Sequence, residues 1–418
     1  MSTNSLFQPL ALPNGAVLKN RIAKAAMEEN LATGEHAPGE ELCRLYRTWA
    51  DGGAGLIITG NVMVDARAMT GPGGVIVENR RHMAALLRWT AEGRAQGAQF
   101  WMQINHPGRQ MKAALRQQAI APSVVPLELG RFSKMFASPR AMAEEDIQDV
   151  RSRFLETALI AEEAGFTGVE IHAAHGYLLS QFLSPLTNLR TDRWGGSLDN
   201  RCRLLVDILQ AVRAAVSPGF CVAVKINSAD FQRGGFDNAE ALQLVTRLNN
   251  LGVDLVEISG GNYESPAMQG RDNDGLSVPR EAYFLEFARQ VKAAAKMPVM
   301  LTGGIRRIEV AEVALSEGIA VIGMATALAL KPDLPRAWRG GNQVAIHAPK
   351  VPWKNKPLAS FASRSLVDAQ LRRLGKGKSA ARCRSPAFAV VEALLWTSRR
   401  TKQYVAWKTK QPQEGVKS

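Results

Sequence analysis

Two histidines and a tyrosine stand close together in the segment HAAHGYLL, where His172, His175 and Tyr177 lie within six residues. They follow directly on the apolar run GVEI, residues 168–171, which predicts a buried strand. Parallel α/β enzymes build their active sites from polar side chains at the C-terminal ends of strands. Two neutral imidazoles can donate hydrogen bonds to a carbonyl oxygen, and a phenol can supply a proton. This combination suits the reduction of an alkene conjugated to a carbonyl group.

Short apolar or β-branched runs alternate with amphipathic segments over most of residues 20–330. The runs that predict strands are residues 21–27, 55–62, 99–105, 168–173, 221–227, 255–261, 298–304 and 320–325. Between them, segments such as 144–165 and 238–252 carry apolar residues at three- and four-residue spacing, as helices that cover a sheet do. Eight strand–helix units in roughly 320 residues favour an α/β fold of the (β/α)8 TIM-barrel type over an open, doubly wound sheet.

Three further segments complete the expected organisation. Residues 11–20, ALPNGAVLKN, predict an N-terminal hairpin with an Asn14-Gly15 turn that could plug the bottom of the barrel. Residues 107–143 predict a long loop rich in Pro, Ser and Met, and loops of that length are usually functional or mobile. The strand–helix alternation stops near residue 340. We therefore divide the chain into a barrel, residues 1–340, and a C-terminal extension, residues 341–418.

The composition points to a globular protein without a membrane-spanning segment. Hydrophobic residues make up 46% of the chain, and no apolar run reaches the roughly 18 residues that cross a bilayer. The N-terminus lacks the basic and apolar regions of a secretory signal. The cysteines, Cys43, Cys202, Cys221 and Cys383, are scattered and form no CxxC pair. We expect reduced thiols in a cytoplasmic protein, with no metal site or iron–sulfur cluster.

The net charge of +14 is concentrated near the C-terminus, because residues 340–418 hold 16 lysines and arginines but only 3 acidic residues. Residues 386–407 are compatible with a helix. Its expected apolar contacts are Phe388, Val391, Leu395, Tyr404 and Trp407. Basic residues mixed with Trp and Leu can bind an anionic membrane surface or nucleic acid. We favour a helical extension packed on the barrel or a neighbouring subunit, with solvated basic side chains, over peripheral membrane contact, and nucleic acid is the least favoured.

The chain resembles the old yellow enzyme family of FMN-dependent ene-reductases, also called NADH:flavin oxidoreductases, over approximately residues 5–340. The most specific part is HAAHGYLLSQFLSPLTNLRTDRWGGSLDNR, and the supporting matches are KNRIAKAAM, MQINHPGRQ, VAVKINSAD and LTGGI. Any one short match is a weak signal. Their order and their positions at strand ends make the combination specific.

The resemblance implies a barrel that binds FMN and uses NADH or NADPH as the reductant. Gln103 would pair its amide with the edge of the flavin pyrimidine, and Lys225 would place a cation beside flavin N1 and O2. Residues of the first two units would lie along the ring, namely Ala25, Ala26, Met27, Glu28 and Gly60. Glycines of the last two strand–helix loops would let backbone N–H groups approach the phosphate. These are Gly303, Gly304 and Gly323, followed by Met324.

The implied reaction has two halves. NADH or NADPH would pass a hydride to flavin N5, and a small-molecule acceptor such as an α,β-unsaturated ketone or aldehyde would then take it up. His172 and His175 would hydrogen-bond the carbonyl oxygen of the acceptor, where negative charge develops. Tyr177, with a reference pKa near 10, would stay protonated at neutral pH and protonate the α-carbon.

One departure from the family pattern lies beside the flavin, where this chain has Glu28 and relatives usually have Thr or Cys. A carboxylate about 4 Å from a reduced flavin opposes its negative charge by about 4 kcal/mol at an effective dielectric near 20. Glu28 could instead be protonated, or pair with Lys24 on the same strand face. We expect Glu28 to lower the flavin potential or to change substrate selection.

A second departure lies at the phosphate site, where relatives usually carry an arginine and this chain has Met324 and Thr326. The phosphate would then be held by backbone amides, by the Thr326 hydroxyl or by a basic residue elsewhere, and FMN retention would be weaker. The chain also lacks the clustered cysteines and the GxGxxG turn of the iron–sulfur and dinucleotide-binding region found in longer relatives.

Other interpretations of the same residues remain open. His172 and His175 could be hydrogen-bonded barrel residues or, from their spacing, metal ligands, although no matching carboxylate–histidine set recurs at other strand ends. Tyr177 could be a packing residue. A second enzymatic function is an NADH oxidase or quinone reductase, which needs no alkene pocket. A third is a flavin-binding barrel that acts mainly through its basic tail at a membrane surface.

Overall fold

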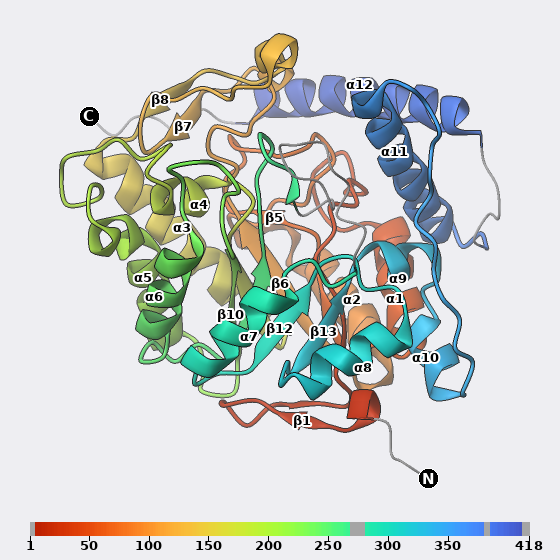
Figure 1. Ribbon diagram of the computed structural model, residues 1–418. Helices are drawn as coiled ribbons and strands as arrows, with labels where there is room; N and C mark the ends of the chain where they lie inside the picture. Colours follow the sequence, from red (N-terminus) through yellow and green to blue (C-terminus); the bar gives the residue numbers. More distant parts are fainter. Residues whose placement is uncertain (1–4, 268–280, 380–384, 412–418) are drawn as a thin grey trace.

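A closed barrel of eight parallel strands forms the centre of the computed structural model, which describes residues 5–267, 281–379 and 385–411 (Figure 1). Each barrel strand pairs with the next one along the chain, and the last pairs with the first. They are β3 (Ile22–Lys24), β4 (Leu56–Ile58), β6 (Gln99–Asn105), β9 (Gly168–Ala173), β10 (Cys221–Asn227), β11 (Leu255–Ser259), β12 (Val299–Thr302) and β13 (Val321–Met324). Every run predicted as a strand contains one of them, so the TIM-barrel prediction is confirmed.

Helices surround the barrel and bury the outward side chains of its strands. They are α1 (Glu40–Asp51), α2 (Met83–Gly93), α3 (Glu144–Glu163), α4 (Leu178–Leu183), α5 (Leu198–Ala215), α6 (Asn238–Leu248), α7 (Leu285–Ala294), α8 (Ile308–Ser316), α9 (Thr326–Leu330) and α10 (Leu334–Arg339). The two predicted helices correspond to α3 and α6. Asp237 caps α6 by accepting a hydrogen bond from the backbone N–H of Glu240 at 2.9 Å, as its residue type favours.

The N-terminal hairpin closes the bottom of the barrel. It consists of β1 (Leu10–Ala11) and β2 (Val17–Leu18), and Gly15 in the turn has φ +86°. Leu12 and Leu18 are buried in the cluster that fills the lower barrel, together with Trp101 and Met300. Figure 1 shows the hairpin at the end of the barrel opposite helix α12, so the predicted plug is confirmed.

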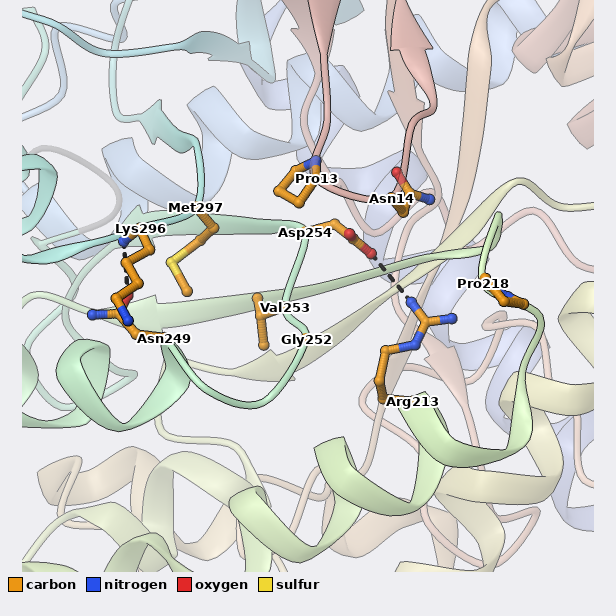
Figure 2. Close-up of a pocket in the computed structure, with 10 residues that line it drawn as sticks. All are labelled: Pro13, Asn14, Arg213, Pro218, Asn249, Gly252, Val253, Asp254, Lys296 and Met297. Carbon is orange, nitrogen blue, oxygen red and sulfur yellow. Dashed lines mark hydrogen bonds and ion pairs between the residues drawn. The ribbon is translucent and has the colours of Figure 1, made fainter.

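A cavity of about 360 Å³ lies at this bottom end, where Figure 2 shows the hairpin turn facing the loops before β10, β11 and β12. Asp254 pairs with Arg213 there at 3.4 Å and accepts a hydrogen bond from Val222 N at 2.8 Å. Asn249 Oδ1 accepts a hydrogen bond from Lys296 N at 2.7 Å. These side chains hold the loops together, and none of the predicted site residues lies in this cavity.

The upper half of the barrel interior is polar, and the strand register decides which polar side chains meet. Lys225 on β10 is level with His172 on β9 and with Glu257 on β11. Gln103 on β6 is level with Glu170 on β9. Because alternate strand residues point inward, all five side chains enter the barrel near the C-terminal ends of the strands. All of them are buried.

The predicted long loop after β6 is folded rather than open. It contains the paired strands β7 (Ala119–Ala121) and β8 (Pro139–Ala141), with short 3-10 turns η4 (Ala113–Leu115) and η5 (Gly130–Met135). Other short elements are η1 (Ser5–Phe7), β5 (Val62–Met63), η2 (Arg80–His82) and η3 (Ala95–Gly97). Met111 and Leu115 of this loop join a small apolar cluster with Tyr404 of the C-terminal extension.

The C-terminal extension forms two helices, α11 (Lys356–Gly375) and α12 (Pro386–Lys410), which pack on each other and on the barrel. α11 lies against α1 and α9. α12 is anchored by Tyr404, whose hydroxyl donates to the carbonyl of Ala66 at 2.8 Å, and by Arg400, which donates to the carbonyl of Thr33 at 3.1 Å. The preferred interpretation of a helical extension packed on the barrel is therefore supported, but α11 was not expected.

The predicted apolar face of the tail helix is partly wrong. Tyr404 is fully buried, whereas Phe388, Val391 and Leu395 are 60%, 53% and 68% exposed. The buried face instead carries the small residues Ala389 and Ala393, together with Arg400. Small side chains allow the two helices to approach closely, so the large apolar residues remain on the outer face. The basic residues are also not all solvated, because Arg372 and Arg400 are buried.

Candidate active site

The three predicted catalytic residues line one cavity of about 90 Å³ at the C-terminal mouth of the barrel. The order of the strands in the barrel brings together residues from the first five strand–helix units. The full lining is Ala26, Met27, Glu28, Asn61, Gln103, His172, His175, Tyr177 and Lys225. Eight of the predicted catalytic and cofactor residues therefore surround the same space.

Both histidines are held in the neutral form. Burial lowers the pKa of His172 well below its usual value, and the neighbouring His175 and Lys225 lower it further. Burial lowers the pKa of His175 to about 3, again with help from Lys225. Nδ1 of His172 accepts a hydrogen bond from the backbone N–H of Ala174 at 3.3 Å, so the ring proton of the neutral form is on Nε2. His172 is therefore a hydrogen-bond donor.

His175 is held in place by its surroundings. Its Nε2 lies 2.7 Å from the hydroxyl of Ser259, and its backbone N–H donates to Asn227 Oδ1 at 3.0 Å. The residue has φ +61°, in the left-handed region, which orients the ring toward β11 rather than along β9. The rings of His172 and His175 are 5.0 Å apart and nearly perpendicular.

Tyr177 lies beside His172, with ring centroids 4.9 Å apart, and its hydroxyl lies 3.0 Å from the hydroxyl of Tyr263. Burial raises the pKa of Tyr177 well above its usual value, and Tyr263 and the Glu28 carboxylate raise it further. The phenol therefore remains protonated at neutral pH. Sequence reasoning missed Tyr263, because this residue follows β11 in a segment without any local chemical signal.

Lys225 pairs inside the barrel with a carboxylate that the sequence analysis did not identify. Its Nζ donates to Glu257 Oε1 at 2.6 Å, and both side chains are almost fully buried. Glu170 completes the group, and Gln103 Nε2 donates to Glu170 Oε1 at 2.6 Å. Burial and the adjacent Glu257 carboxylate raise the pKa of Glu170, whereas Lys225 lowers the pKa of Glu257 against the effect of burial. Glu170 is therefore the weaker acid of the two.

The two acidic residues in this group were missed, although the sequence carried a signal for them. Glu170 stands in the strand GVEI and Glu257 in the strand LVEI, each at an inward position of an otherwise apolar run. A buried carboxylate requires a cation or a hydrogen-bond donor. The pattern therefore predicts a polar barrel interior, but not which partner each acid meets.

A second cavity, of about 270 Å³, adjoins the first at Ala26, His175 and Lys225 and extends over the ends of β12 and β13. It is lined by Gly303, Gly304 and Gly323, and also by Met324 and Thr326. Gly304 has φ +73°, a conformation that favours glycine. A Cβ atom on Gly323 would lie 1.9 Å from Thr302 Oγ1. Only glycine fits these two positions, as a close backbone cradle for a phosphate requires.

The same cavity contains a basic residue that the sequence reasoning did not name. Arg306 lines it, donates from Nε to the carbonyl of Gly304 at 3.1 Å, and is 25% exposed. The adjoining cavities, the glycine cradle and the buried Lys225 fit a flavin mononucleotide.

In addition, Asn61 Oδ1, in the wall of the first cavity, is buried without a hydrogen-bond partner among the described residues.

Two predicted cofactor residues lie elsewhere in the barrel. Ala25 is fully buried in the lower barrel cluster and lines neither cavity. Gly60 lies behind the loop that follows β3, and a Cβ atom there would approach Met27 O to 2.1 Å and Glu29 Oε2 to 2.2 Å. The small size of Gly60 thus makes room for that loop.

Glu28 does not pair with Lys24. The Nζ atom of Lys24 instead donates to Glu29 Oε1 at 3.0 Å and to the carbonyl of Ile58 at 2.8 Å. Glu28 pairs with Arg364 of helix α11 at 3.2 Å. The sequence analysis did not identify Arg364 as the partner of Glu28, because the local sequence around Glu28 gives no information on contacts with the C-terminal extension.

Two negative findings apply to the described parts of the chain, residues 5–267, 281–379 and 385–411. No three His, Cys, Asp or Glu side chains lie close enough together to hold a metal ion. No helix there has the length and apolar character needed to span a bilayer. Cys43, Cys202 and Cys221 are free thiols, and Cys383 lies outside the described residues.

The barrel and its paired cavities define a flavin-type oxidoreductase site, and comparisons with known proteins agree. Residues 5–343 match the model of the NADH:flavin oxidoreductase / NADH oxidase family. The NADH-dependent flavin oxidoreductase iliE of Hypocrea jecorina is 36% identical over 376 residues, which cover 82% of this chain and 93% of the relative. The protein of the same name from Neonectria sp. is also 36% identical over 79% of this chain, which spans only 46% of that relative's length.

The fold comparison gives the same result. The old yellow enzyme homologue from Zymomonas mobilis superposes with a TM-score of 0.71 at 25% identity, covering 82% of this chain and 95% of that chain. The chain therefore belongs to the NADH:flavin oxidoreductase family that includes old yellow enzyme, and it is an oxidoreductase of that class. The resemblance inferred from the sequence motifs is confirmed.

Proposed function

We propose that this protein binds FMN and uses NADH or NADPH to reduce activated alkenes of the α,β-unsaturated carbonyl type. The observation that carries the proposal is the single cavity lined by His172, His175 and Tyr177 together with Gln103 and Lys225. A bound flavin would supply the hydride. Gln103 and Lys225 would hold its ring, and the glycine cradle of the adjoining cavity would hold its phosphate.

The protein side chains have distinct tasks in this proposal. Nε2–H of His172 donates a hydrogen bond to the carbonyl oxygen of the substrate and stabilises the charge that develops there. His175 acts beside it, with its ring oriented by Ser259. Tyr177 holds a proton at its hydroxyl and delivers it to the α-carbon. Because the site is buried, these hydrogen bonds act at a low local dielectric, where they are stronger than in water.

An NADH oxidase or quinone reductase is the alternative, since the family name includes NADH oxidases. Anaerobic reduction of the purified protein, followed by stopped-flow reoxidation, separates these functions. The proposal expects fast reoxidation by cyclohexenone and slower reoxidation by oxygen or a quinone. Reoxidation by oxygen or quinone alone, with no reaction of any enone, would contradict it in favour of the alternative.

We further propose that Arg306 takes the place of the missing phosphate-site arginine. A hydrogen bond between charged groups contributes about 1.5–3 kcal/mol, so Arg306→Ala is expected to weaken FMN binding by about 10- to 100-fold. Fluorescence titration of the apoprotein with FMN measures this. Arg307→Ala is the matched control, because Arg307 also pairs with Glu281, at 3.0 Å, but does not line the cavity. Equal losses in both variants would contradict the assignment.

We propose that the outer face of α12 makes a peripheral contact with the anionic, cytoplasmic surface of a membrane. Val391, Leu394 and Leu395 are 53%, 56% and 68% exposed, and Arg399 and Lys402 are exposed nearby. Apolar residues beside basic ones match the chemistry of an anionic bilayer surface. We expect the protein to co-sediment with vesicles that contain anionic phospholipid but not with neutral phosphatidylcholine vesicles.

Replacement of both Leu394 and Leu395 by serine should abolish this co-sedimentation. Leu87→Ser is the control, because Leu87 is 48% exposed on the unrelated helix α2. Sedimentation that is the same with both vesicle types, or unchanged in the double variant, would refute membrane contact. Loss of a dimer in the double variant, measured by light scattering, would assign the face to a second copy of the chain instead.

A further inference from the structure

The side-chain hydroxyl of Ser259 has one hydrogen-bond partner among the described residues, the ring of His175. Ser259 is the last residue of β11 and is buried, and its Oγ lies 2.7 Å from Nε2 of His175. The backbone carbonyl of Ser259 is used separately, because it accepts a hydrogen bond from Ser228 N at 2.7 Å. A buried hydroxyl needs an acceptor for its single proton. Nε2 of His175 is the acceptor that the described part of the chain offers it.

The direction of this hydrogen bond determines which nitrogen of His175 carries the proton. Burial lowers the pKa of His175 to about 3, so the ring is neutral and has one N–H group. If Ser259 donates to Nε2, that proton is on Nδ1. The reverse direction would leave the serine proton buried and without an acceptor among the described residues, which is unfavourable. The contact therefore favours the Nδ1–H form of His175.

His172 has the opposite arrangement. Its Nδ1 accepts a hydrogen bond from Ala174 N at 3.3 Å, so its proton is on Nε2. Nε2 of His172 and Nδ1 of His175 make no hydrogen bond within the described residues, and neither atom is among the fully buried polar atoms there. Both residues line the cavity of about 90 Å³, with their rings 5.0 Å apart. Each ring therefore has one nitrogen held by the protein and one N–H group available to a ligand.

We propose that Ser259 is a positioning residue that keeps the proton of His175 on Nδ1, so that this N–H donates to the substrate carbonyl oxygen beside Nε2–H of His172. An unprotonated nitrogen at that place would present a lone pair to the oxygen and would not stabilise its developing negative charge. The proposal rests on the proposed alkene reduction and specifies how the protein supplies two donors from two neutral rings.

The position of the proton can be measured without turnover. Long-range ¹H–¹⁵N correlation NMR of the oxidised holoenzyme, labelled with ¹⁵N-histidine, distinguishes the two neutral forms of each ring. The signals of His175 are identified by their absence in His175→Gln. The wild-type protein is expected to show Nδ1–H at His175 and Nε2–H at His172. In Ser259→Ala a large share of His175 should change to Nε2–H, while His172 stays the same. Ser259→Cys keeps a weak donor, so its spectrum should be intermediate.

The same variants should differ in their response to an enone. Titration of the flavin absorbance with cyclohexenone is expected to show binding about 2- to 10-fold weaker in Ser259→Ala, the loss of one hydrogen bond between neutral groups. Stopped-flow reoxidation of the reduced protein by cyclohexenone should slow by about 10-fold or more, because a donor to a developing charge contributes more in the transition state. Ser259→Cys should recover part of both losses.

The matched control is Ser228→Ala, which removes the hydroxyl of a second buried serine beside the same strand. Ser228 is 1% exposed and Ser259 is 3% exposed, and Oγ of Ser228 has no hydrogen-bond partner among the described residues. Its removal should change neither the His175 signals nor enone binding. An unchanged His175 spectrum in Ser259→Ala, or an equal change in Ser228→Ala, would overturn the proposal. So would Nε2–H at His175 in the wild type, a result that does not depend on the folding of any variant.

The proposal and the proposed function fail in different ways. Nδ1–H at His175, lost in Ser259→Ala, in a protein whose reduced form no enone reoxidises would contradict the proposed function and support the effect of Ser259 on the ring. Rapid reoxidation by cyclohexenone at the same rate in the wild type and in Ser259→Ala would support the proposed function and overturn the role of Ser259.

Discussion

Replacement of Tyr177 by phenylalanine is expected to slow the reoxidation of the reduced protein by cyclohexenone by about 10²- to 10⁴-fold, the range for general acid catalysis. The reduction of the flavin by NADH should change little, because that half of the reaction needs no proton from the phenol. Anaerobic stopped-flow measurement of the two halves separates these effects. Phenylalanine keeps the ring that packs 4.9 Å from His172, so the loss reports on the hydroxyl.

Tyr263→Phe provides the control for this variant. The two hydroxyls are 3.0 Å apart, so removal of the Tyr263 hydroxyl should have a smaller effect, through the lost hydrogen bond alone. A large loss in Tyr263→Phe together with a small loss in Tyr177→Phe would assign the proton to Tyr263. Because burial raises the pKa of Tyr177 well above its usual value, the wild-type rate should also be flat from about pH 6 to 9.

Among these substitutions, Lys225→Met is expected to have the largest effect on the free energy of unfolding. Lys225 pairs with Glu257 at 2.6 Å, and Glu257 is fully buried. Without the cation the carboxylate remains buried and unpaired, which costs about 3–5 kcal/mol in the free energy of unfolding. Urea unfolding should show this loss. The variant should also retain less flavin, because Lys225 is the only cation that the described residues place in the wall of the smaller cavity.

A double variant separates stability from cofactor binding. Lys225→Met combined with Glu257→Gln leaves no unpaired charge, so most of the lost stability should return. The flavin should still bind weakly, because no cation faces the ring. If Lys225→Met unfolds at the same urea concentration as the wild type, the buried ion pair does not stabilise the protein as argued. If the double variant recovers flavin binding as well, Lys225 has no direct role toward the cofactor.

Much of the site could be predicted because its residues are contiguous in the sequence or stand at strand ends. His172 lies near the end of one strand, and His175 and Tyr177 follow directly after it, so their mutual proximity needs no knowledge of the fold. Gln103 and Lys225 lie near the C-terminal ends of two other strands, and their side chains point inward. The closed barrel brings both side chains to the same cavity. The strands themselves were recognisable because parallel barrel strands are buried on both faces. They therefore appear in the sequence as short apolar or β-branched runs between helices.

The partners of these residues could not be predicted in the same way. Lys225 was expected to lie beside the flavin, but its partner Glu257 on β11 could not be foreseen, because only the register of the two strands brings them level. A pair with Lys24 was one possibility for Glu28, but Glu29 takes that position. The outer face of α12 was misassigned because the helix packs through alanines, and apolar periodicity does not distinguish a buried face from an exposed one.

The sequence by itself determined the barrel, the plugging hairpin, the family and the cluster of two histidines and a tyrosine, because these depend on local periodicity and on residues that are neighbours in the chain. Only the tertiary structure decided the charges around that cluster. Ion pairs such as Glu28–Arg364, between residues 336 positions apart, depend on the path of the whole chain. For the same reason, only the folded molecule shows that the basic extension pairs with Glu28, a residue of the cavity wall.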